Sequence, residues 1–266
     1  MLNNRHRPRK RFGQNFLHDP GVIERIIRAI DPRPGEHLVE IGPGLGALTR
    51  PLLRAVGSLD VVEIDRDIIP LLQESCGAYG ELRIHNQDVL KFDFTSLAAG
   101  HALRVIGNLP YNISSPLIFH LLEQLPVIHD MHFMLQREVA ERLAAAPATE
   151  HYGRLSVMVQ WRCCVQLLFN VGPGAFKPAP KVDSAVVRLT PHRHVPIHVN
   201  DEKGFADLVK QAFSQRRKTL RNTLKGLLTA EEIAALSIDP MRRAETLSLA
   251  DYALLSNALK NDGCEG

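Results

Sequence analysis

Between residues 37 and 135 the sequence alternates between short apolar runs and longer amphipathic stretches. Each apolar run suits one buried strand, and apolar residues recur at helical spacing in the segments that follow. A further amphipathic helix is expected over residues 21–30. This alternation predicts an α/β fold with a doubly wound, mostly parallel sheet covered by helices on both faces. The predicted strands are "HLVEI" (37–41), "LDVVEI" (59–64), "LRIH" (82–85), "LRVIG" (103–107) and "DMHFML" (130–135).

The pattern changes after Trp161. Two β-rich runs, residues 163–171 and 184–189, flank a proline-rich loop with no helix between them, which predicts an antiparallel hairpin at one end of the sheet. Three or four amphipathic helices are expected from Pro191 to about residue 260. We therefore predict a first domain over residues 1–195 and a small all-α domain over residues 196–266.

Positive charge is concentrated in two windows, residues 1–11 and 215–225, which hold ten of the 32 basic residues and no acid. The remaining sequence has 22 bases against 29 acids, a net charge of −7. Two positive patches on an acidic body favour a nucleic acid partner, although a basic tail and a solvated helix face are the plainer alternative. The predicted RNA-contacting residues are Arg9, Lys10 and Arg11 in the N-terminal arm, and Arg217, Arg221 and Lys225 on one face of a helix expected over 213–225.

The four cysteines form no CxxC pair, and the histidines show no ligand spacing. We expect reduced thiols, no disulfide and no metal site. The basic N-terminus lacks the apolar core of a signal peptide, and no apolar run is long enough to span a bilayer. These features predict a cytoplasmic protein.

A glycine-rich turn, "GPGLG" (42–46), follows the first predicted strand. Glycines allow a tight reversal and let backbone amides approach a ligand, so Gly42 and Gly44 are candidate cofactor contacts. Glu63 lies at the end of the second strand, 23 residues after Glu40, a spacing suited to binding ribose hydroxyls. Asp65 is the competing acid, and its alternative role is the N-cap of the next helix.

Asp88 and Val89 follow the third predicted strand. The Asp88 carboxylate could accept a hydrogen bond from an adenine amino group, and Val89 could offer its backbone; the alternative for Asp88 is a turn aspartate. Together with the glycine turn and Glu63, they describe an adenosine lying across the carboxyl ends of adjacent strands. NAD would satisfy this much of the pattern equally well.

The fourth predicted strand runs into Asn108, Leu109, Pro110 and Tyr111. Asn108 offers a side-chain carbonyl, Leu109 a backbone carbonyl, and Pro110 removes a competing N–H donor. Tyr111 offers a flat surface on which a base can stack. This turn is suited to holding the amino group of a planar ring while an electrophile approaches. The alternative is an ordinary turn with Tyr111 packed in it.

These motifs together resemble the S-adenosylmethionine-dependent ribosomal RNA adenine N6-dimethyltransferases, in particular the bacterial small-subunit enzymes. The resemblance runs from about residue 8 to residue 256. Its most specific blocks are "GQNFL", "NLPYNISSPL" and "PAPKVDSAVVRL"; the others are "VEIGPGLGALT", "VVEIDRD", "QDVL", "MLQREVAERL", "YGRLSVMVQ" and "FSQRRKTLRNTL".

The resemblance implies a seven-stranded Rossmann-like methyltransferase sheet and S-adenosylmethionine as cofactor. The sequence says little about oligomerisation, and we assume a monomer. It implies dimethylation of two adjacent adenosines in the 3′-terminal hairpin loop of 16S rRNA, late in small-subunit assembly. Asn15, Leu17, Gly42, Glu63, Asp88 and Asn108 match cofactor-binding positions, with Gly44 and Val89 beside them, and Asn108 also holds the target amine. Tyr111 and Phe176 match aromatic positions that flank the target base.

Phe176 lies among glycines and prolines that leave it few packing partners, which favours exposure at a site over a packed loop anchor. Three other functions remain open at this point. A DNA adenine methyltransferase would share the fold and the turn, but would usually need a target-recognition insertion. A methylase of large-subunit rRNA is a close variant, and a non-catalytic assembly factor would use the fold only as a scaffold.

Overall fold

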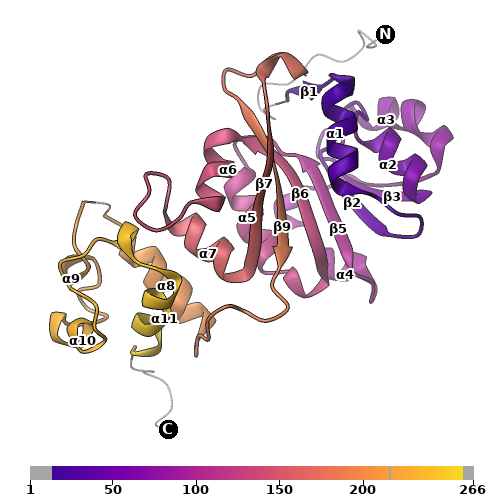
Figure 1. Cartoon of the computed structure of the whole chain (residues 1–266). Helices are drawn as coiled ribbons and strands as arrows, with labels where there is room; N and C mark the ends of the chain where they lie inside the picture. Colours follow the sequence, from indigo (N-terminus) through magenta and orange to yellow (C-terminus); the bar gives the residue numbers. More distant parts are fainter. Residues whose placement is uncertain (1–13, 216, 260–266) are drawn as a thin grey trace. The chain divides into compact units, whose positions relative to one another are not determined.

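The chain folds into two compact units in the computed structural model, which describes residues 14–215 and 217–259 (Figure 1). The first unit comprises Met1–Ala140 and Val165–Pro191, and the second comprises Glu141–Cys164 and His192–Gly266. The second unit thus includes a segment that precedes the last two long strands. The predicted division into domains 1–195 and 196–266 concerns independent folding, and it stays a prediction.

The first unit is built on a seven-stranded sheet of order β4-β3-β2-β5-β6-β9-β7. The β4-β3, β3-β2, β2-β5 and β5-β6 pairs are parallel, and β9 runs antiparallel to β6. The predicted mostly parallel α/β fold is therefore confirmed, and the two late β-rich runs are neighbours at one end of the sheet. The strands are β2 (His37–Ile41), β3 (Ser58–Val62), β4 (Glu81–His85), β5 (Leu103–Asn108), β6 (Ile128–Gln136), β7 (Cys163–Val171) and β9 (Ser184–Pro191).

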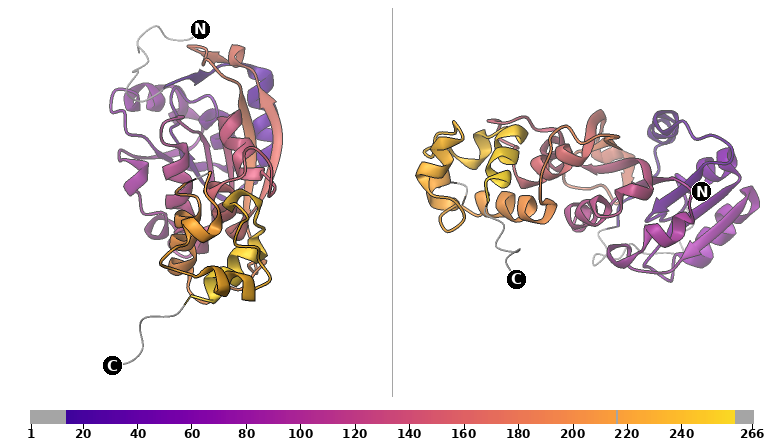
Figure 2. Two further views of the ribbon diagram at one scale, coloured as in Figure 1. Left: turned by 90° about the vertical axis from the view of Figure 1, so that its left-hand side faces the viewer. Right: turned by 90° about the horizontal axis from the view of Figure 1, so that it is seen from below.

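A separate two-stranded ribbon joins β1 (Phe16–Leu17) to β8 (Phe176–Lys177). Helices lie on both sides of the large sheet (Figure 2). The α-helices up to Pro191 are α1 (Pro20–Ile30), α2 (Thr49–Val56), α3 (Ile69–Cys76), α4 (Phe94–Ala98), α5 (Ser114–Leu122), α6 (Arg137–Ala144) and α7 (Arg154–Arg162). Short 3₁₀ turns are η2 (Gly77–Tyr79), η3 (Val89–Lys91), η4 (Leu125–Val127) and η5 (Pro173–Ala175).

The central strands are buried on both faces. Successive residues of β5 point to opposite sides of the sheet, yet Leu103 to Gly107 are all buried. Gly107 pairs with Ile41 of β2, and a Cβ atom at residue 107 would lie 2.8 Å from the Ile41 carbonyl oxygen. Glycine therefore allows β2 and β5 to approach closely, which brings Asn108 next to the glycine turn that follows β2.

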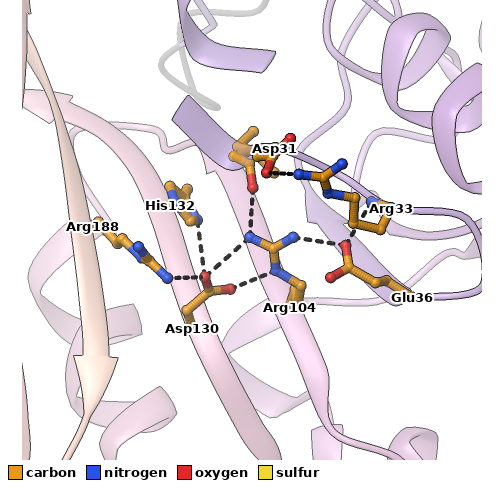
Figure 3. Close-up of polar contacts among 8 residues, drawn as sticks. Asp31, Arg33, Glu36, Arg104, Asp130, His132 and Arg188 are labelled. Carbon is orange, nitrogen blue, oxygen red and sulfur yellow. Dashed lines mark hydrogen bonds and ion pairs between the residues drawn. The ribbon is translucent and has the colours of Figure 1, made fainter. Parts of the chain in front are cut away.

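The amino-terminal ends of β5 and β6 hold a buried ion cluster (Figure 3). Arg104 donates to both carboxylate oxygens of Asp130, at 2.8 and 3.1 Å, to Glu36 at 2.7 Å and to the Ile30 carbonyl at 2.6 Å. Arg188 of β9 donates to Asp130 at 3.0 Å. The Asp130 side chain is fully buried, and its ion pairs keep the pKa of its carboxyl below the usual value despite burial. The cluster ties α1, β5, β6 and β9 together.

Between Pro191 and residue 259, the described residues form four α-helices, in agreement with the three or four expected. They are α8 (Glu202–Ala212), α9 (Leu220–Thr223), α10 (Ala230–Ala235) and α11 (Leu249–Asn257), with the 3₁₀ turn η6 (Ala244–Thr246). The helix predicted over 213–225 is wrong. Thr219 forms an antiparallel bridge with Arg243, so the segment is divided and α9 spans only four residues. Arg217, Arg221 and Lys225 are exposed, but they do not share a face of one helix.

Arg9, Lys10 and Arg11 lie outside the described residues. In residues 14–215 and 217–259, no helix is long and apolar enough to cross a membrane. The same residues contain no cluster of three or more histidine, cysteine or acidic side chains suited to a metal ion. Cys76, Cys163 and Cys164 are free thiols.

Candidate functional site

A cavity of about 300 Å³ opens at the carboxyl ends of β2, β3 and β5. All eight predicted cofactor residues line it, together with three further residues of the fourth-strand turn. They are Asn15, Leu17, Gly42, Gly44, Glu63, Asp88, Val89, Asn108, Leu109, Pro110 and Tyr111. The structure thus brings together residues from five separate sequence segments, while the role of each stays a prediction.

The glycine turn that follows β2 lines the cavity. Gly42 has φ +65° and donates from its backbone N–H to the Val62 carbonyl at 2.9 Å. Space is open where a Cβ atom at residue 42 would stand, whereas at Gly44 (φ +54°) it would meet the Phe16 ring at 3.1 Å. Both positions favour glycine for its freedom in the left-handed region. The helix that follows the turn, α2, begins at Thr49.

Glu63 is the first residue beyond β3, because the strand ends at Val62 and not at residue 64 as predicted. Its side chain lines the cavity, while Asp65 does not. Glu63 accepts a hydrogen bond from the Asp65 backbone N–H at 2.7 Å, and burial raises the pKa of its carboxyl. Asp65 is not the N-cap of α3, which is Ile68. The geometry supports the choice of Glu63 over Asp65.

Asp88 follows β4 and is a turn aspartate, which was the alternative to the predicted adenine contact. Its Oδ1 atom accepts from the Leu90 backbone N–H at 3.0 Å, which caps the 3₁₀ turn η3. The same side chain lines the cavity beside Val89. One carboxylate oxygen fixes the turn, and the second carboxylate oxygen is available to a ligand.

Glu40 is a cavity residue that sequence reasoning used only as a spacing reference. It is 2% exposed within β2, and Thr49 Oγ1 donates to its Oε2 atom at 2.6 Å. Burial, reinforced by the nearby Glu63 charge, raises the pKa of Glu40 to about 8, so the folded protein favours its protonated form. The sequence feature that could have indicated a role for Glu40 is an acid inside an otherwise apolar strand, two residues before Gly42.

Asn108 ends β5, and its amide is oriented by the segment that precedes β1. Its Nδ2 atom donates to the Asn15 backbone carbonyl at 3.1 Å. A carbonyl only accepts hydrogen bonds, so the amide must present its nitrogen to Asn15 and its Oδ1 atom elsewhere. Among the described residues, no donor reaches Asn108 Oδ1. The same segment is held at Gln14, whose Nε2 atom donates to Asp65 at 3.0 Å.

Backbone hydrogen bonds hold Leu109 and Pro110 in the turn. The Leu109 backbone N–H donates to the Met134 carbonyl at 3.1 Å, and the Pro110 carbonyl accepts from Ile113 N–H at 3.2 Å and Ser114 Oγ at 3.0 Å. No described residue donates to the Leu109 carbonyl. Asn108 Oδ1 and the Leu109 carbonyl are therefore two acceptors on one turn at the cavity that receive no hydrogen bond from the part of the chain that the structure describes.

The expectation that Phe176 is exposed at the site is wrong. Phe176 is 3% exposed, lies in β8 opposite Leu17 of β1, and does not line the cavity. The ribbon pairing supplies packing partners that are distant in sequence, which a local reading of the glycine- and proline-rich loop could not anticipate. Its role beside a target base stays a prediction that would require movement of this ribbon.

The site combines a parallel α/β sheet, a glycine turn and a carboxylate after β3 with two acceptors at the end of β5 that have no donor among the described residues. These features are typical of S-adenosylmethionine-dependent methyltransferases that act on amino groups. Residues 5–261 match the model of the family described as "Ribosomal RNA adenine dimethylase". The chain belongs to this family.

The chain is similar over nearly its whole length to proteins named "Ribosomal RNA small subunit methyltransferase A". It is 61% identical to the protein of Pseudomonas aeruginosa, covering 96% of this chain and 95% of the relative. It is 59% identical to that of Nitrosococcus oceani, covering 94% and 96%.

Two solved structures share the fold. One is a dimethyladenosine transferase from Plasmodium falciparum, with a TM-score of 0.77 and 27% identity over 90% of this chain and 95% of the other. The second is the 23S rRNA methyltransferase ErmE, with a TM-score of 0.72 and 25% identity over 92% and 99%. The similarity extends through both units of the chain.

Proposed function

We propose that this protein dimethylates the N6 amino groups of two adjacent adenosines in the 3′-terminal hairpin loop of 16S rRNA. The substrate is the immature small ribosomal subunit, and the protein acts on it as a cytoplasmic monomer. The names and near-complete coverage of the bacterial relatives support this substrate. The pair of unpaired acceptors, Asn108 Oδ1 and the Leu109 carbonyl, is the observation that carries the chemistry.

The residues at the cavity fit S-adenosylmethionine by their chemistry. Glu63 would accept from the ribose hydroxyls and Asp88 from the adenine amino group, while the open space at Gly42 lets the backbone approach the ligand. Asn15 and Leu17 close the cavity from the β1 side. When bound, the cofactor supplies an electrophilic methyl group on a sulfonium centre.

The turn at 108–111 would hold the target adenine. Asn108 Oδ1 and the Leu109 carbonyl accept the two hydrogens of the exocyclic amine, which directs the nitrogen lone pair out of the ring plane and toward the methyl carbon. This alignment is the main catalytic contribution of the chain, since the free amine is a poor nucleophile and gains most from a fixed attack geometry. No general base is required, because the alkylated nitrogen is cationic and readily loses its proton.

Tyr111 lines the same cavity and offers its ring as a stacking surface, worth about 1–3 kcal/mol per base in single-stranded nucleic acids. We further propose that exposed Arg217, Arg221 and Lys225 contact rRNA phosphates. Contacts from Arg9, Lys10 and Arg11 of the N-terminal arm are part of the same proposal. Neutralising these charges should weaken subunit binding and reduce its dependence on salt concentration.

Methylation of large-subunit rRNA is the second candidate, because the similarity to ErmE covers 92% of this chain. Purified immature small subunits, large subunits and duplex DNA, each offered with labelled cofactor, separate the candidates. We expect label only in the small subunit, on two adjacent adenosines near the 3′ end of 16S rRNA. Label confined to the large subunit or to DNA would overturn the proposed substrate.

Asn108→Ala tests the mechanism. We expect no detectable transfer, with thermal unfolding close to that of the unmodified protein. Asn257→Ala is the matched control, because Asn257 Nδ2 also donates to a backbone carbonyl, that of His198, at 3.1 Å, and Asn257 lies outside the cavity. Near-normal transfer by the folded Asn108→Ala variant would remove Asn108 from the mechanism.

A further inference from the structure

Tyr111 is held at its far end by a residue of another strand. Its hydroxyl oxygen lies 2.8 Å from Ser184 Oγ, a hydrogen-bond distance. Ser184 is fully buried, whereas the Tyr111 side chain is half-buried and lines the cavity. Ser184 itself does not line the cavity. Among the described residues, the hydrogen bond to Tyr111 is the only side-chain hydrogen bond of Ser184, and it links Ser184 to the cavity.

Ser184 is a rigid anchor. It is the first residue of β9 and pairs with Gln136 at the end of β6. The preceding Asp183 carbonyl accepts from the Arg137 backbone N–H at 2.9 Å, which extends the pairing beyond the strand. The oxygen that contacts Tyr111 is thus fixed by the sheet and not by a mobile loop.

The tyrosine ring is consequently fixed at both ends. Its backbone follows Pro110, whose carbonyl accepts from Ser114 Oγ at the start of α5, and its hydroxyl is hydrogen-bonded to Ser184. A tyrosine side chain has two rotatable bonds, and a hydrogen bond at the hydroxyl restricts both. The plane of the ring is therefore set before any base arrives.

We infer that Ser184 is a positioning residue for methyl transfer, which fixes the plane of Tyr111 against which the target adenine stacks. This inference rests on the proposed function and extends it to a residue that never touches the substrate. Preorganised stacking keeps the adenine amine in the plane of its two acceptors without an ordering cost at each turnover.

The second methyl transfer should depend on Ser184 more than the first. The unmodified amine has two hydrogens for the two acceptors, Asn108 Oδ1 and the Leu109 carbonyl. After one transfer a single N–H remains, so one hydrogen bond is lost and the stacked ring carries more of the alignment. A loosened Tyr111 ring should therefore allow N6-methyladenosine to accumulate.

Ser184→Ala tests the inference on immature small subunits, with product masses and rates measured separately for each methyl group. We expect kcat for the first transfer to fall about three- to tenfold, as for loss of one neutral hydrogen bond, and kcat for the second to fall further. KM for the subunit and cofactor affinity should change less than about twofold, because neither acceptor nor cofactor contact is removed. Monomethylated adenosine should rise from a trace to a major product.

Tyr111→Phe removes the same hydrogen bond from the other side, and a double variant completes the cycle. We expect Tyr111→Phe to reproduce the product ratio of Ser184→Ala, and the double variant to add no more than about a twofold loss. Unchanged rates in Ser184→Ala, or multiplicative losses in the double variant, would overturn the inference. If Ser184→Ala does not fold, Tyr111→Phe decides alone, and an unchanged product ratio then rejects the inference.

Ser156→Ala is the matched control, because Ser156 is equally buried and donates one hydrogen bond, to the Arg142 carbonyl at 2.5 Å, outside the cavity. It should lower thermal stability without changing the ratio of mono- to dimethylated product. Methyl transfer by the unmodified protein to the immature small subunit is measured in parallel and tests the proposed function itself. No transfer by that protein would count against the function, whereas normal transfer by Ser184→Ala would count only against the positioning role.

Discussion

Replacing Arg104 with methionine should destabilise the protein strongly, because Arg104 is the main partner of a buried carboxylate. The Arg104 side chain is 9% exposed and contacts both oxygens of Asp130, whose side chain is 0% exposed. Methionine preserves much of the aliphatic volume but removes the guanidinium. Asp130 would keep Arg188 and the buried His132 ring, whose Nδ1 atom lies 3.9 Å from its Oδ2 atom and whose pKa burial lowers to about 4. The Glu36 carboxylate and the Ile30 carbonyl would each lose a donor. Removing one partner of a buried ion pair typically costs about 3–5 kcal/mol.

Thermal unfolding followed by circular dichroism measures this loss. For a chain of this size, 3–5 kcal/mol corresponds to a decrease in Tm of about 6–20 °C. Arg28→Met is the matched control, because Arg28 pairs with Glu24 at 2.7 Å but both side chains are more than two-thirds exposed, at 75% and 71%. Solvent screens such a pair, so the control should shift Tm by no more than about 2 °C.

A second variant distinguishes the cost of an unpaired charge from simple loss of packing. Arg104→Met combined with Asp130→Leu removes both buried charges and leaves Arg188, which is 36% exposed and can turn to solvent. This double variant should be more stable than Arg104→Met alone. Equal Tm values for Arg104→Met and Arg28→Met, or a double variant less stable than the single one, would refute the reasoning. Cofactor affinity below Tm should be unchanged, since Arg104 lies at the end of β5 opposite Asn108.

Two predictions concern the acids of the cavity. Glu63→Gln should weaken cofactor binding about 10- to 100-fold, because the proposed ribose hydrogen bonds lose their charged acceptor. Titration calorimetry measures the affinity, and a change below about twofold would contradict the role of Glu63. Glu40 ionises near pH 4.5 in an unfolded chain and near pH 8 in the folded protein, so its stabilising contribution is complete below pH 4.5 and is lost as the pH rises toward 8. Urea unfolding at a series of pH values measures this effect. Between pH 4.5 and pH 8, the free energy of unfolding of the unmodified protein should fall relative to that of Glu40→Gln, by up to about 1.4 kcal/mol per pH unit. Parallel curves for the two proteins would contradict the assignment.

The sheet could be predicted from sequence because its strands are buried on both faces. Such strands are continuous apolar runs, and β2 and β5 each appear as one. Parallel strands also bring their carboxyl ends to one edge, so Glu63, Asp88 and Asn108 could be placed together before any contact was known. The predicted ends of strands were less accurate, and Glu63 falls just outside β3.

Features that depend on distant pairing could not be read from local patterns. The spacing of Arg217, Arg221 and Lys225 fits a helix, but Leu220 N–H donates to the Arg242 carbonyl at 2.8 Å and Thr219 bridges to Arg243, which divides the segment. Phe176 is buried by a two-residue strand near the N-terminus, whose sequence is too short to predict as a strand. In both cases tertiary hydrogen bonds override a pattern that is correct for an isolated segment.

The ligand preference of the turn at 108–111 depends on which of its polar groups are already hydrogen-bonded to the rest of the chain. Asn15 accepts from the amide nitrogen of Asn108, Met134 accepts from the Leu109 N–H, and Pro110 has no N–H to offer. The two acceptors that remain at the cavity suit a ligand atom that carries two donor hydrogens. The nitrogen of an exocyclic amine has two such hydrogens, whereas a hydroxyl has one. The same four residues in a chain without the β1 segment would lack a fixed Asn108 amide, so the motif alone does not define the activity.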